Sequence, residues 1–333
     1  MTIRVFNRSV LLCGLTVFLL FSMSVEASRP VHEEAREPGW FRLLRPRMDD
    51  PAAQLAYADE LREVGRRRGA QRQYRALVRY WPGTREAAQA QYAYAKLLEE
   101  RSRRSRALDE YANLLEDYTG MIPHQDVRER LFDMGTTTMD ERRAQFLFFP
   151  GFHAPERAIP YFEAVVKHGP QWKRAPEAQY HIGRIKEKNR RYEEAVFAYD
   201  RVGARYPRSP FAEDAAFGRA RVLYRLSREA PNHLDGAETA LHALASFLRS
   251  YPESEHAGQA REYMRTVYGE MARLNYERAR YYDRIARRPR AAITTYERFL
   301  KEYPDSEWAD QARERLDQLR TKMEEHDEKE TRR

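Results

Sequence analysis

One stretch near the C-terminus, Ala292–Ala312, contains the feature that most constrains how this chain can fold. Counted from its first alanine, bulky apolar residues follow at positions +4, +7, +8 and +11, which is the spacing of one face of an α-helix. Pro304 at +12 ends that helix, because proline lacks an N–H and its ring clashes with the preceding turn. Ser306 is then expected to cap a second helix, whose alanines again share one face. The stretch therefore predicts a helical hairpin.

The same pattern of an alanine, spaced bulky residues and a turn occurs six times in one register. Successive copies start 37 to 52 residues apart, so each is at least one two-helix unit long. The leading alanines are Ala70, Ala107, Ala158, Ala195, Ala240 and Ala292. Thr84, Ser209 and Ser254 stand two residues after their prolines, as Ser306 does, so they are expected to cap helices in the same way. A hairpin of this size cannot bury its own apolar face and has to stack on its neighbours. The sequence thus predicts an all-α solenoid of about six helical hairpins over residues 51–325, closed by a C-terminal capping helix.

The N-terminal segment has the pattern of a targeting signal. Arg4 and Arg8 precede an apolar run over residues 10–25, and small residues stand at the −3 and −1 positions of a cut between Ala27 and Ser28. This three-part pattern is typical of an exported signal peptide over residues 1–27. A retained transmembrane helix is the alternative, since the run approaches the lower length limit for spanning a membrane. We expect cleavage, which places the protein in the periplasm or on the periplasmic face of the outer membrane.

Cys13 is the only cysteine of the chain, and it decides whether a lipid anchor is expected. A lipidated cysteine follows a small residue at the end of the apolar run, whereas Leu12 precedes Cys13 and the run continues past Phe21. The sequence therefore disfavours a lipid anchor at Cys13. Cleavage after Ala27 leaves no cysteine, and hence neither disulfides nor a thiol nucleophile.

The rest of the chain divides into three parts. Residues 28–50 contain several prolines and no helical period, so we expect an extended lead-in. Asp50 is a good N-cap and Pro51 suits the first helical position, so the solenoid is expected to begin there. Residues 326–333 are highly charged, and we expect them to form a disordered tail.

A phenylalanine-rich segment separates the second and third copies of the repeat. It follows a helix that we expect to start at a capping box formed by Asp126 and Glu129 and to end near Gln145. Either the segment folds back and fills the groove between neighbouring hairpins, or it is an exposed patch for a partner. Its aromatic side chains are the candidate partner-binding residues, namely Phe146, Phe148, Phe149 and Phe152.

A second aromatic cluster lies in a long helix expected between Ser254 and about Arg287. Its tyrosines could line a peptide-binding groove, but a stripe of this kind more often fills the core. They are Tyr263, Tyr268, Tyr276, Tyr281 and Tyr282.

The sequence contains no pattern typical of a catalytic or cofactor site. The nine histidines are scattered, with no HExxH motif and no pair at i, i+4. A glycine-rich phosphate loop and a G-x-S-x-G elbow are also missing from the sequence. The carboxylates alternate with arginines along the helices, as surface ion pairs do. We predict a protein that is not an enzyme and that needs no cofactor or metal.

The formal net charge of +8 bears on the class of partner. Behind a signal peptide, an acidic protein face or the phosphate-rich surface of an outer membrane is a better candidate than nucleic acid. Because the basic residues are interspersed with acidic ones, a solvated, salt-bridged surface is the simplest interpretation. We expect protein partners, no nucleic acid and only a peripheral association with the outer membrane.

The repeated unit resembles the tetratricopeptide repeat, in the variety common in exported bacterial proteins. From Ala240 to Leu319 the likeness is narrower. The stretch Phe247–Ala257, the paired Tyr281-Tyr282 before a short basic turn, and Tyr303–Ser306 resemble the C-terminal half of the BamD family. Proteins of that family are tetratricopeptide subunits of the outer-membrane β-barrel assembly machinery.

This resemblance implies a non-catalytic scaffold of outer-membrane β-barrel protein assembly and insertion. Such a scaffold would bind the membrane-embedded β-barrel assembly protein at one end and receive unfolded outer-membrane proteins at the other. The alternative is a periplasmic tetratricopeptide adaptor of the Tol/cell-division or peptidoglycan-synthesis machinery. Adaptors similar to the Tol-associated coordinator typically place a coiled coil before their repeats, and residues 28–50 show no heptads.

Overall fold

The computed structural model describes residues 45–143, 152–230 and 233–331, all of which belong to one compact unit. These residues form thirteen α-helices, which confirms the predicted all-α class. In chain order the helices are α1 (Pro51–Glu63), α2 (Arg67–Tyr80), α3 (Arg85–Glu100), α4 (Arg104–Asp117), α5 (His124–Asp140), α6 (Ile159–His168), α7 (Ala175–Lys188), α8 (Tyr192–Arg205), α9 (Ala212–Glu229), α10 (Leu234–Ser250), α11 (Ala257–Arg280), α12 (Pro289–Glu302) and α13 (Ala309–Thr331).

Three shorter elements complete the chain order. A 3₁₀ turn, η2 (Pro155–Ala158), leads into α6, and a π-helical turn, η3 (Tyr281–Ile285), extends α11. Two short strands, β1 (Arg142–Arg143) and β2 (Phe152–His153), pair antiparallel, with Arg142 opposite His153.

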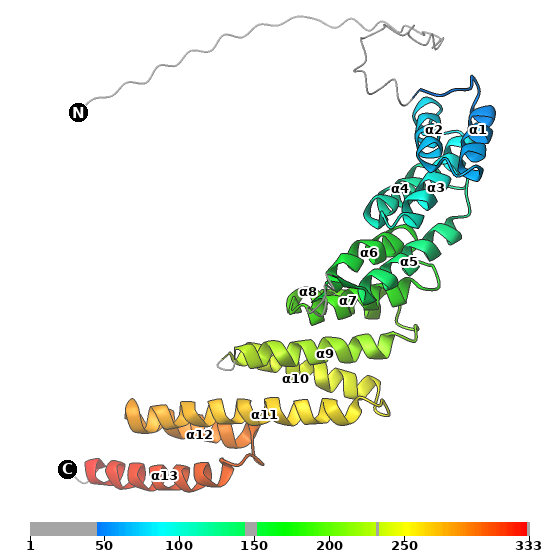
Figure 1. Cartoon of the computed structure of the whole chain (residues 1–333). Coiled ribbons are helices and arrows are strands. Elements are labelled where there is room, and N and C mark those ends of the chain that lie inside the picture. The colour runs from blue at the N-terminus through cyan, green and yellow to red at the C-terminus, as the bar shows by residue number, and fades with distance from the viewer. Residues whose placement is uncertain (1–44, 144–151, 231–232, 332–333) are drawn as a thin grey trace, which may run out of the picture. The chain divides into compact units, whose positions relative to one another are not determined.

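Successive helices pack as antiparallel hairpins, as Figure 1 shows for α9 with α10 and for α11 with α12. Every helix contacts the next one along the chain. Further contacts join α1 to α3, α4 to α6, α7 to α9 and α9 to α11. The six copies of the sequence pattern correspond to α2/α3, α4/α5, α6/α7, α8/α9, α10/α11 and α12/α13. The predicted solenoid of six hairpins is therefore confirmed.

The core of each repeat is a large side chain at position +4 of the sequence pattern. At this position stand Tyr74, Tyr111, Phe162, Tyr199, Leu244 and Tyr296, and each is at most 1% exposed. All six leading alanines are completely buried. Small residues let neighbouring backbones approach, and the large side chain fills the space left between them. The periodicity read from the sequence is thus the periodicity of the core.

Tyr199 illustrates how tightly the helices close around such a side chain. A Cβ atom added to Gly183 on α7 would lie 2.6 Å from the Tyr199 ring, and one added to Gly218 on α9 would lie 2.7 Å from it. Both distances are shorter than real carbon–carbon contacts. Glycine is therefore required at both positions by the ring that lies between them.

A buried polar ladder accompanies the aromatic core. The Tyr199 hydroxyl donates a 2.7 Å hydrogen bond to Glu187, and Arg221 of the next repeat donates to both oxygens of the same carboxylate at 2.7 and 2.8 Å. The Glu187 side chain is only 7% exposed. The same arrangement recurs at Glu99, whose carboxylate accepts hydrogen bonds from Tyr111 and Arg130. Near Tyr296, the Asp283 carboxylate accepts two hydrogen bonds from Arg315.

Buried glutamines join three of the hairpins to the helix that precedes them. The side-chain amides of Gln54, Gln91 and Gln179 each donate to a backbone carbonyl 19 residues further along, at 3.0 to 3.3 Å. The Gln54 carbonyl oxygen also accepts from the backbone N–H groups of Arg47 and Met48. This glutamine therefore fixes the end of the lead-in against the first hairpin.

Several predicted helix boundaries need correction. Thr84 does cap α3, and Asp50 caps α1. Ser306 does not cap α13, however: the helix begins at Ala309, and it is the backbone carbonyl of Ser306 that accepts from the Ala309 N–H. Ser209 and Ser254 are placed in the same way, three residues before α9 and α11. In these three repeats an additional turn separates the serine from the helix.

The helix before the phenylalanine-rich segment also differs from the prediction. α5 begins at His124, and Asp126 bonds to Tyr92 and Arg130 instead of forming a capping box with Glu129. The same helix ends at Asp140 and not near Gln145, because the chain turns extended into β1. At the C-terminus, α13 continues to Thr331, since residues 326–331 contain neither glycine nor proline to stop it.

The predicted signal peptide, its cleavage site and Cys13 lie outside the described residues. Among the residues from 45 onward that the structure describes, no helix has the length and apolarity needed to cross a membrane.

Substituting Gly218→Ala or Gly183→Ala should lower the free energy of unfolding by about 2 kcal/mol. The new methyl group would overlap a ring that is held by its hydrogen bond to Glu187, so the repeats have to separate slightly. Urea unfolding followed by circular dichroism measures the change. Gly269→Ala is the control: it lies within α11 with no atom within 4 Å of the new Cβ, so it should stabilise the protein by about 0.5 to 1 kcal/mol. Equal changes in the free energy of unfolding at Gly183, Gly218 and Gly269 would contradict this account of the core.

A second prediction concerns acid stability. Burial alone would raise the pKa of the Glu187 carboxyl, but hydrogen bonds from Arg221 and Tyr199 outweigh it and hold this pKa below its ordinary value of 4.5. The unfolded chain therefore takes up the proton first as the pH falls. The stability contributed by Glu187 is complete above about pH 4.5 and disappears as the pH drops through the folded-state pKa.

Glu187→Gln should accordingly cost about 2 kcal/mol at pH 7, and the difference from wild type should narrow below pH 4.5. Urea titrations between pH 7 and pH 3 measure the loss of stability on substitution and its change with pH. Glu297→Gln, which removes an exposed pair with Arg320, should cost less than about 1 kcal/mol. A wild-type advantage that persists unchanged at pH 3 would show that the ionised carboxylate is not the stabilising species.

Candidate functional site

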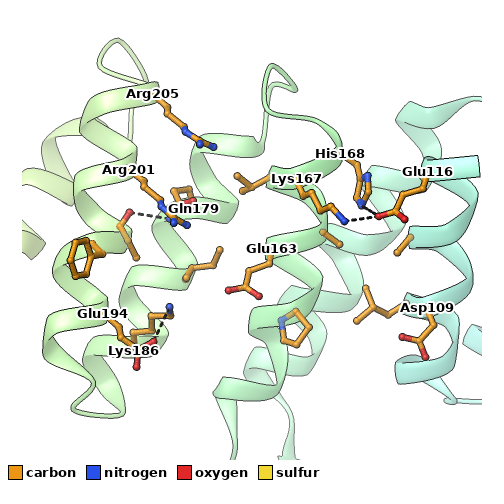
Figure 2. Close-up of a pocket in the computed structure, with 18 residues that line it drawn as sticks. Asp109, Glu116, Glu163, Lys167, His168, Gln179, Lys186, Glu194, Arg201 and Arg205 are labelled. Atoms are coloured by element: carbon orange, nitrogen blue, oxygen red, sulfur yellow. Dashed lines mark hydrogen bonds and ion pairs between the residues drawn. The ribbon is translucent and has the colours of Figure 1, made fainter. Parts of the chain in front are cut away.

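A cavity of about 700 Å³ opens on the face formed by α4, α6 and α8, and we call it the α6 groove. Its lining residues come from α4 (Leu108 to Glu116), α6 (Pro160 to His168), α7 (Gln179 to Lys186) and α8 (Glu194 to Arg205). Figure 2 shows the charged side chains distributed along the groove on these helices. The site is therefore assembled from three consecutive repeats.

The floor of the groove is apolar. Ala164, Ile182 and Ala198 contribute buried side chains to it, because each lies on the edge of a packed helix face. Phe197 stands beside this floor and is 69% exposed. On α8 the core positions are Tyr192, Ala195, Ala198, Tyr199 and Val202, so Phe197 lies off the buried face. An exposed phenylalanine next to an apolar floor is typical of a binding surface.

Ion pairs connect the helices on both sides of the floor. The Lys167 ammonium on α6 lies 2.5 Å from a Glu116 oxygen on α4, and the His168 ring nitrogen lies 3.5 Å from the same oxygen. On the other side Lys186 of α7 lies 3.2 Å from Glu194 of α8. Both pairs are drawn as dashed lines in Figure 2. The groove is thus braced by its own charges.

The pKa values of these groups follow from their partners. The hydrogen bond from Lys167 lowers the pKa of the Glu116 carboxyl, and hydrogen bonds from Arg191 and Lys186 lower that of Glu194. Burial lowers the pKa of the His168 imidazole. At neutral pH Glu116 and Glu194 are therefore ionised and paired with cations, and His168 is neutral.

Not every charge of the groove is paired: Asp109, Glu163, Arg201 and Arg205 line it without an ion pair to any described residue. Arg201 is the one nearest to Phe197 in the sequence. It lies one turn after Phe197 on α8, is exposed, and has no hydrogen bond or ion pair to any other described residue. Its guanidinium is free to receive a carboxylate. An apolar floor, an exposed aromatic ring and arginines without an acidic partner suit an extended peptide better than a reacting small molecule.

The chemistry of the lining agrees with a binding surface. Among the described residues that line the groove there is no serine, threonine, tyrosine or cysteine. Glu116 and Glu194 are engaged with lysines, and Asp109 and Glu163 are exposed. Within the described parts of the chain no group of histidines, cysteines and carboxylates is arranged to hold a metal ion.

The residues proposed from the sequence lie elsewhere. Phe146, Phe148 and Phe149 are outside the described residues, and of Phe152 only the backbone, in β2, is described. Ala27 and Ser28 are also outside them. These remain predictions. Of the tyrosine cluster, Tyr276 is buried against Tyr296 and Phe299, and Tyr263 stacks on Tyr224, so core filling is confirmed there.

Sequence reasoning missed Phe197 and Arg201. One signal was available: Phe197 stands two positions after Ala195, where the repeat pattern predicts solvent. An aromatic residue at a position that the period assigns to the surface calls for an explanation other than packing. The sequence does not show that Lys167 and Ile182 lie beside Phe197 and Arg201, because these neighbours are set by how the repeats stack.

Two family models match the chain. Residues 153–332, more than half of the chain, match the YfiO model, which is described as an outer membrane lipoprotein. Residues 55–121 match a tetratricopeptide repeat model. The first match covers β2 to α13 and the second covers α1 to α4. No curated protein matches the chain.

Solved structures with the same repeat are similar at low identity. YrrB, a tetratricopeptide protein with an unusual peptide-binding site, is 18% identical with a TM-score of 0.30, covering 64% of this chain and 92% of its own. The C-terminal part of a tetratricopeptide protein from Cytophaga hutchinsonii is 17% identical with a TM-score of 0.30, covering 80% and 88%. PilF of Pseudomonas aeruginosa is 12% identical with a TM-score of 0.27, covering 80% and 97%.

Proposed function

Because this chain belongs to the YfiO family of outer membrane lipoproteins, we propose that it is an exported, non-catalytic scaffold of outer-membrane β-barrel protein assembly. The family match over residues 153–332 is the observation that carries the proposal. The resemblance of Ala240–Leu319 to the BamD family supports the same role. Its proposed partners are the membrane-embedded β-barrel assembly protein and unfolded outer-membrane proteins.

The α6 groove supplies the physical basis for binding an unfolded chain. An extended segment has alternating side chains, of which an apolar one can pack on Phe197 and the floor formed by Ala164 and Ile182. A carboxylate of the segment can pair with Arg201. These contacts are few and shallow, so binding would be weak and reversible, as a scaffold that hands on its substrates requires.

The anchoring mode belongs to the proposal as well. The family match begins at residue 153 and does not include Cys13. We propose that the protein acts at the periplasmic face of the outer membrane without a lipid on Cys13, in line with the position of that cysteine inside the apolar run. Mass spectrometry of the protein isolated from envelopes would detect a diacylglycerol group if this part of the proposal is wrong.

The role in assembly is tested by purifying the tagged full-length protein from envelope membranes in mild detergent. Co-purification of the β-barrel assembly protein in near-stoichiometric amount is the expected result. Recovery of Tol-system or peptidoglycan-synthesis proteins in its place would leave the fold unchanged and overturn the function.

The groove is tested with the double variant Phe197→Ser/Arg201→Gln. Affinity for an unfolded outer-membrane β-barrel protein, measured by fluorescence anisotropy in dilute urea, should fall roughly 10- to 100-fold, since one aromatic contact and one charge pair are lost. Both side chains are exposed, so the free energy of unfolding should change by less than about 0.5 kcal/mol.

Tyr80→Ser/Arg208→Gln is the matched control for this variant. It removes an exposed aromatic ring and an exposed arginine that do not line the groove. Its affinity should equal that of the wild type. Equal losses in the two double variants would show that the α6 groove is not the binding surface.

A further inference from the structure

Two turns far apart in the sequence share one unusual pattern. Between α1 and α2 the chain reads Val64-Gly65 followed by three arginines, and between α11 and α12 it reads Ile285-Ala286 followed by Arg-Arg-Pro-Arg. Val64 is 62% exposed and Ile285 is 71% exposed, and these are two of the few large apolar side chains on the described surface. In both turns a protruding aliphatic residue is thus followed at once by three basic ones.

Two intervening turns carry the same charge. The α3–α4 turn contains Arg101, Arg103 and Arg104, and the α7–α8 turn contains Lys188, Arg190 and Arg191. Successive helices are antiparallel, so these four turns, each of which follows an odd-numbered helix, lie on the same side of the stacked helices. We call the four turns, residues 64–68, 101–104, 188–191 and 285–290, the arginine edge.

The backbone of these turns does not explain the arginines. A residue with positive φ recurs at the same place in each, namely Gly65, Ser102, Arg190 and Arg287, with φ of 51° to 75°. The left-handed conformation is therefore a property of the turn, and it occurs with glycine, serine and arginine alike. The basic side chains must have another reason to be there.

The charges at the two outer turns are uncompensated. Arg104 pairs with Glu141 and Arg191 pairs with Glu194, as basic residues along the helices commonly do. None of the six arginines at the outer turns forms an ion pair with any residue that the structure describes; these are Arg66, Arg67, Arg68, Arg287, Arg288 and Arg290. Asp283, the nearest carboxylate in the last turn, is held by Arg315.

The last turn also borders a cationic cavity. Arg287, Arg288 and Arg290 line a space of about 790 Å³ together with Lys322 and His326 of α13, and none of its lining side chains that the structure describes is acidic. Its remaining walls include Leu319 and Met323, so apolar surface lies beside the cations. The first turn of α12 contains no acidic residue, so its unpaired N–H groups add to the positive potential.

We propose that the arginine edge docks the protein on a membrane surface rich in anionic phospholipid headgroups. The arginines would contact headgroup phosphates, and Val64 and Ile285 would enter the headgroup layer beside them. Exposed aliphatic residues flanked by arginines favour a lipid surface over an acidic protein, because a membrane accepts charge and apolar groups in adjacent layers. Tyr281, 51% exposed at the start of η3, adds an amphipathic ring of the kind found at such interfaces. This surface is distinct from the α6 groove, and its role does not depend on the proposed function.

The test measures binding of the full-length protein to vesicles of phosphatidylglycerol and phosphatidylcholine, and to vesicles of phosphatidylcholine alone. Every protein compared retains the apolar run over residues 10–25, so its contribution cancels. Each basic residue near an anionic surface contributes roughly fivefold to binding. Arg287→Gln/Arg288→Gln/Arg290→Gln should therefore weaken binding to the anionic vesicles by about 100-fold and leave binding to phosphatidylcholine vesicles unchanged.

Arg85→Gln/Lys173→Gln/Arg208→Gln is the matched control, with the same loss of charge at three exposed residues of the opposite turns. It should bind anionic vesicles within about twofold of wild type. Val64→Ser/Ile285→Ser keeps every charge and should still lose about tenfold, since two buried aliphatic contacts are removed.

Three results would overturn the proposal. The first is equal weakening by the edge and control variants, which would indicate a general charge effect. The second is equal binding of the wild type to both kinds of vesicle. The third is normal vesicle binding by the arginine-edge variant together with loss of binding to soluble poly-L-glutamate, which would assign the edge to an acidic protein.

Discussion

Every repeat of this protein depends on one packing constraint: a large side chain has to fit beneath small residues of the helices around it. At Tyr199 this fit allows no more than a hydrogen atom at Gly183 and Gly218. The ring comes from α8, and the glycines come from α7 and α9, on either side of it. One contact therefore sets the spacing of three helices. Because the constraint recurs in each repeat, the array is specified by nearest-neighbour fits.

The polar ladder adds specificity to this packing. A tyrosine ring alone could be accommodated at slightly different depths, but the Tyr199 hydroxyl has to meet Glu187, and Glu187 has to meet Arg221. A buried carboxylate left without these partners would be costly, so the arrangement penalises any other register. Where the position +4 residue is Phe162 or Leu244, this polar restraint is missing and shape alone positions the helices.

The fold could be predicted because its signal is local. Apolar spacing, a proline at +12 and paired alanines lie within about 20 residues, which is why the six hairpins and their core residues were recognised from the sequence. The polar ladder was not recognised, because Glu187 and Arg221 are 34 residues apart and either could equally be a solvated surface charge. The caps at Ser209 and Ser306 were misjudged because the extra turn after each serine has no residue that marks it.

The candidate site was harder to predict for a related reason. Phe197 and Arg201 are ordinary residues of an amphipathic helix until α4 and α6 place an apolar floor beside them. Likewise, a single turn with three arginines is unremarkable in a chain with 59 basic residues. The arginine edge becomes distinctive only when the hairpins bring four such turns to one side, and when the acidic partners found along the helices are missing at its two ends.

The two surfaces share a further property, which is that neither uses the large side chains at position +4 or the polar ladder beside them. The exposed residues Phe197 and Arg201 of the α6 groove lie on the outer side of α8, and the arginine edge is made from turns in which glycine, serine and arginine all adopt the positive φ. The Tyr199–Glu187–Arg221 ladder lies between the helices and contributes to neither surface. A stacked-hairpin architecture can therefore present a groove for an extended chain on one face and a basic edge on another, because the buried contacts that set the stacking leave both free to carry other residues.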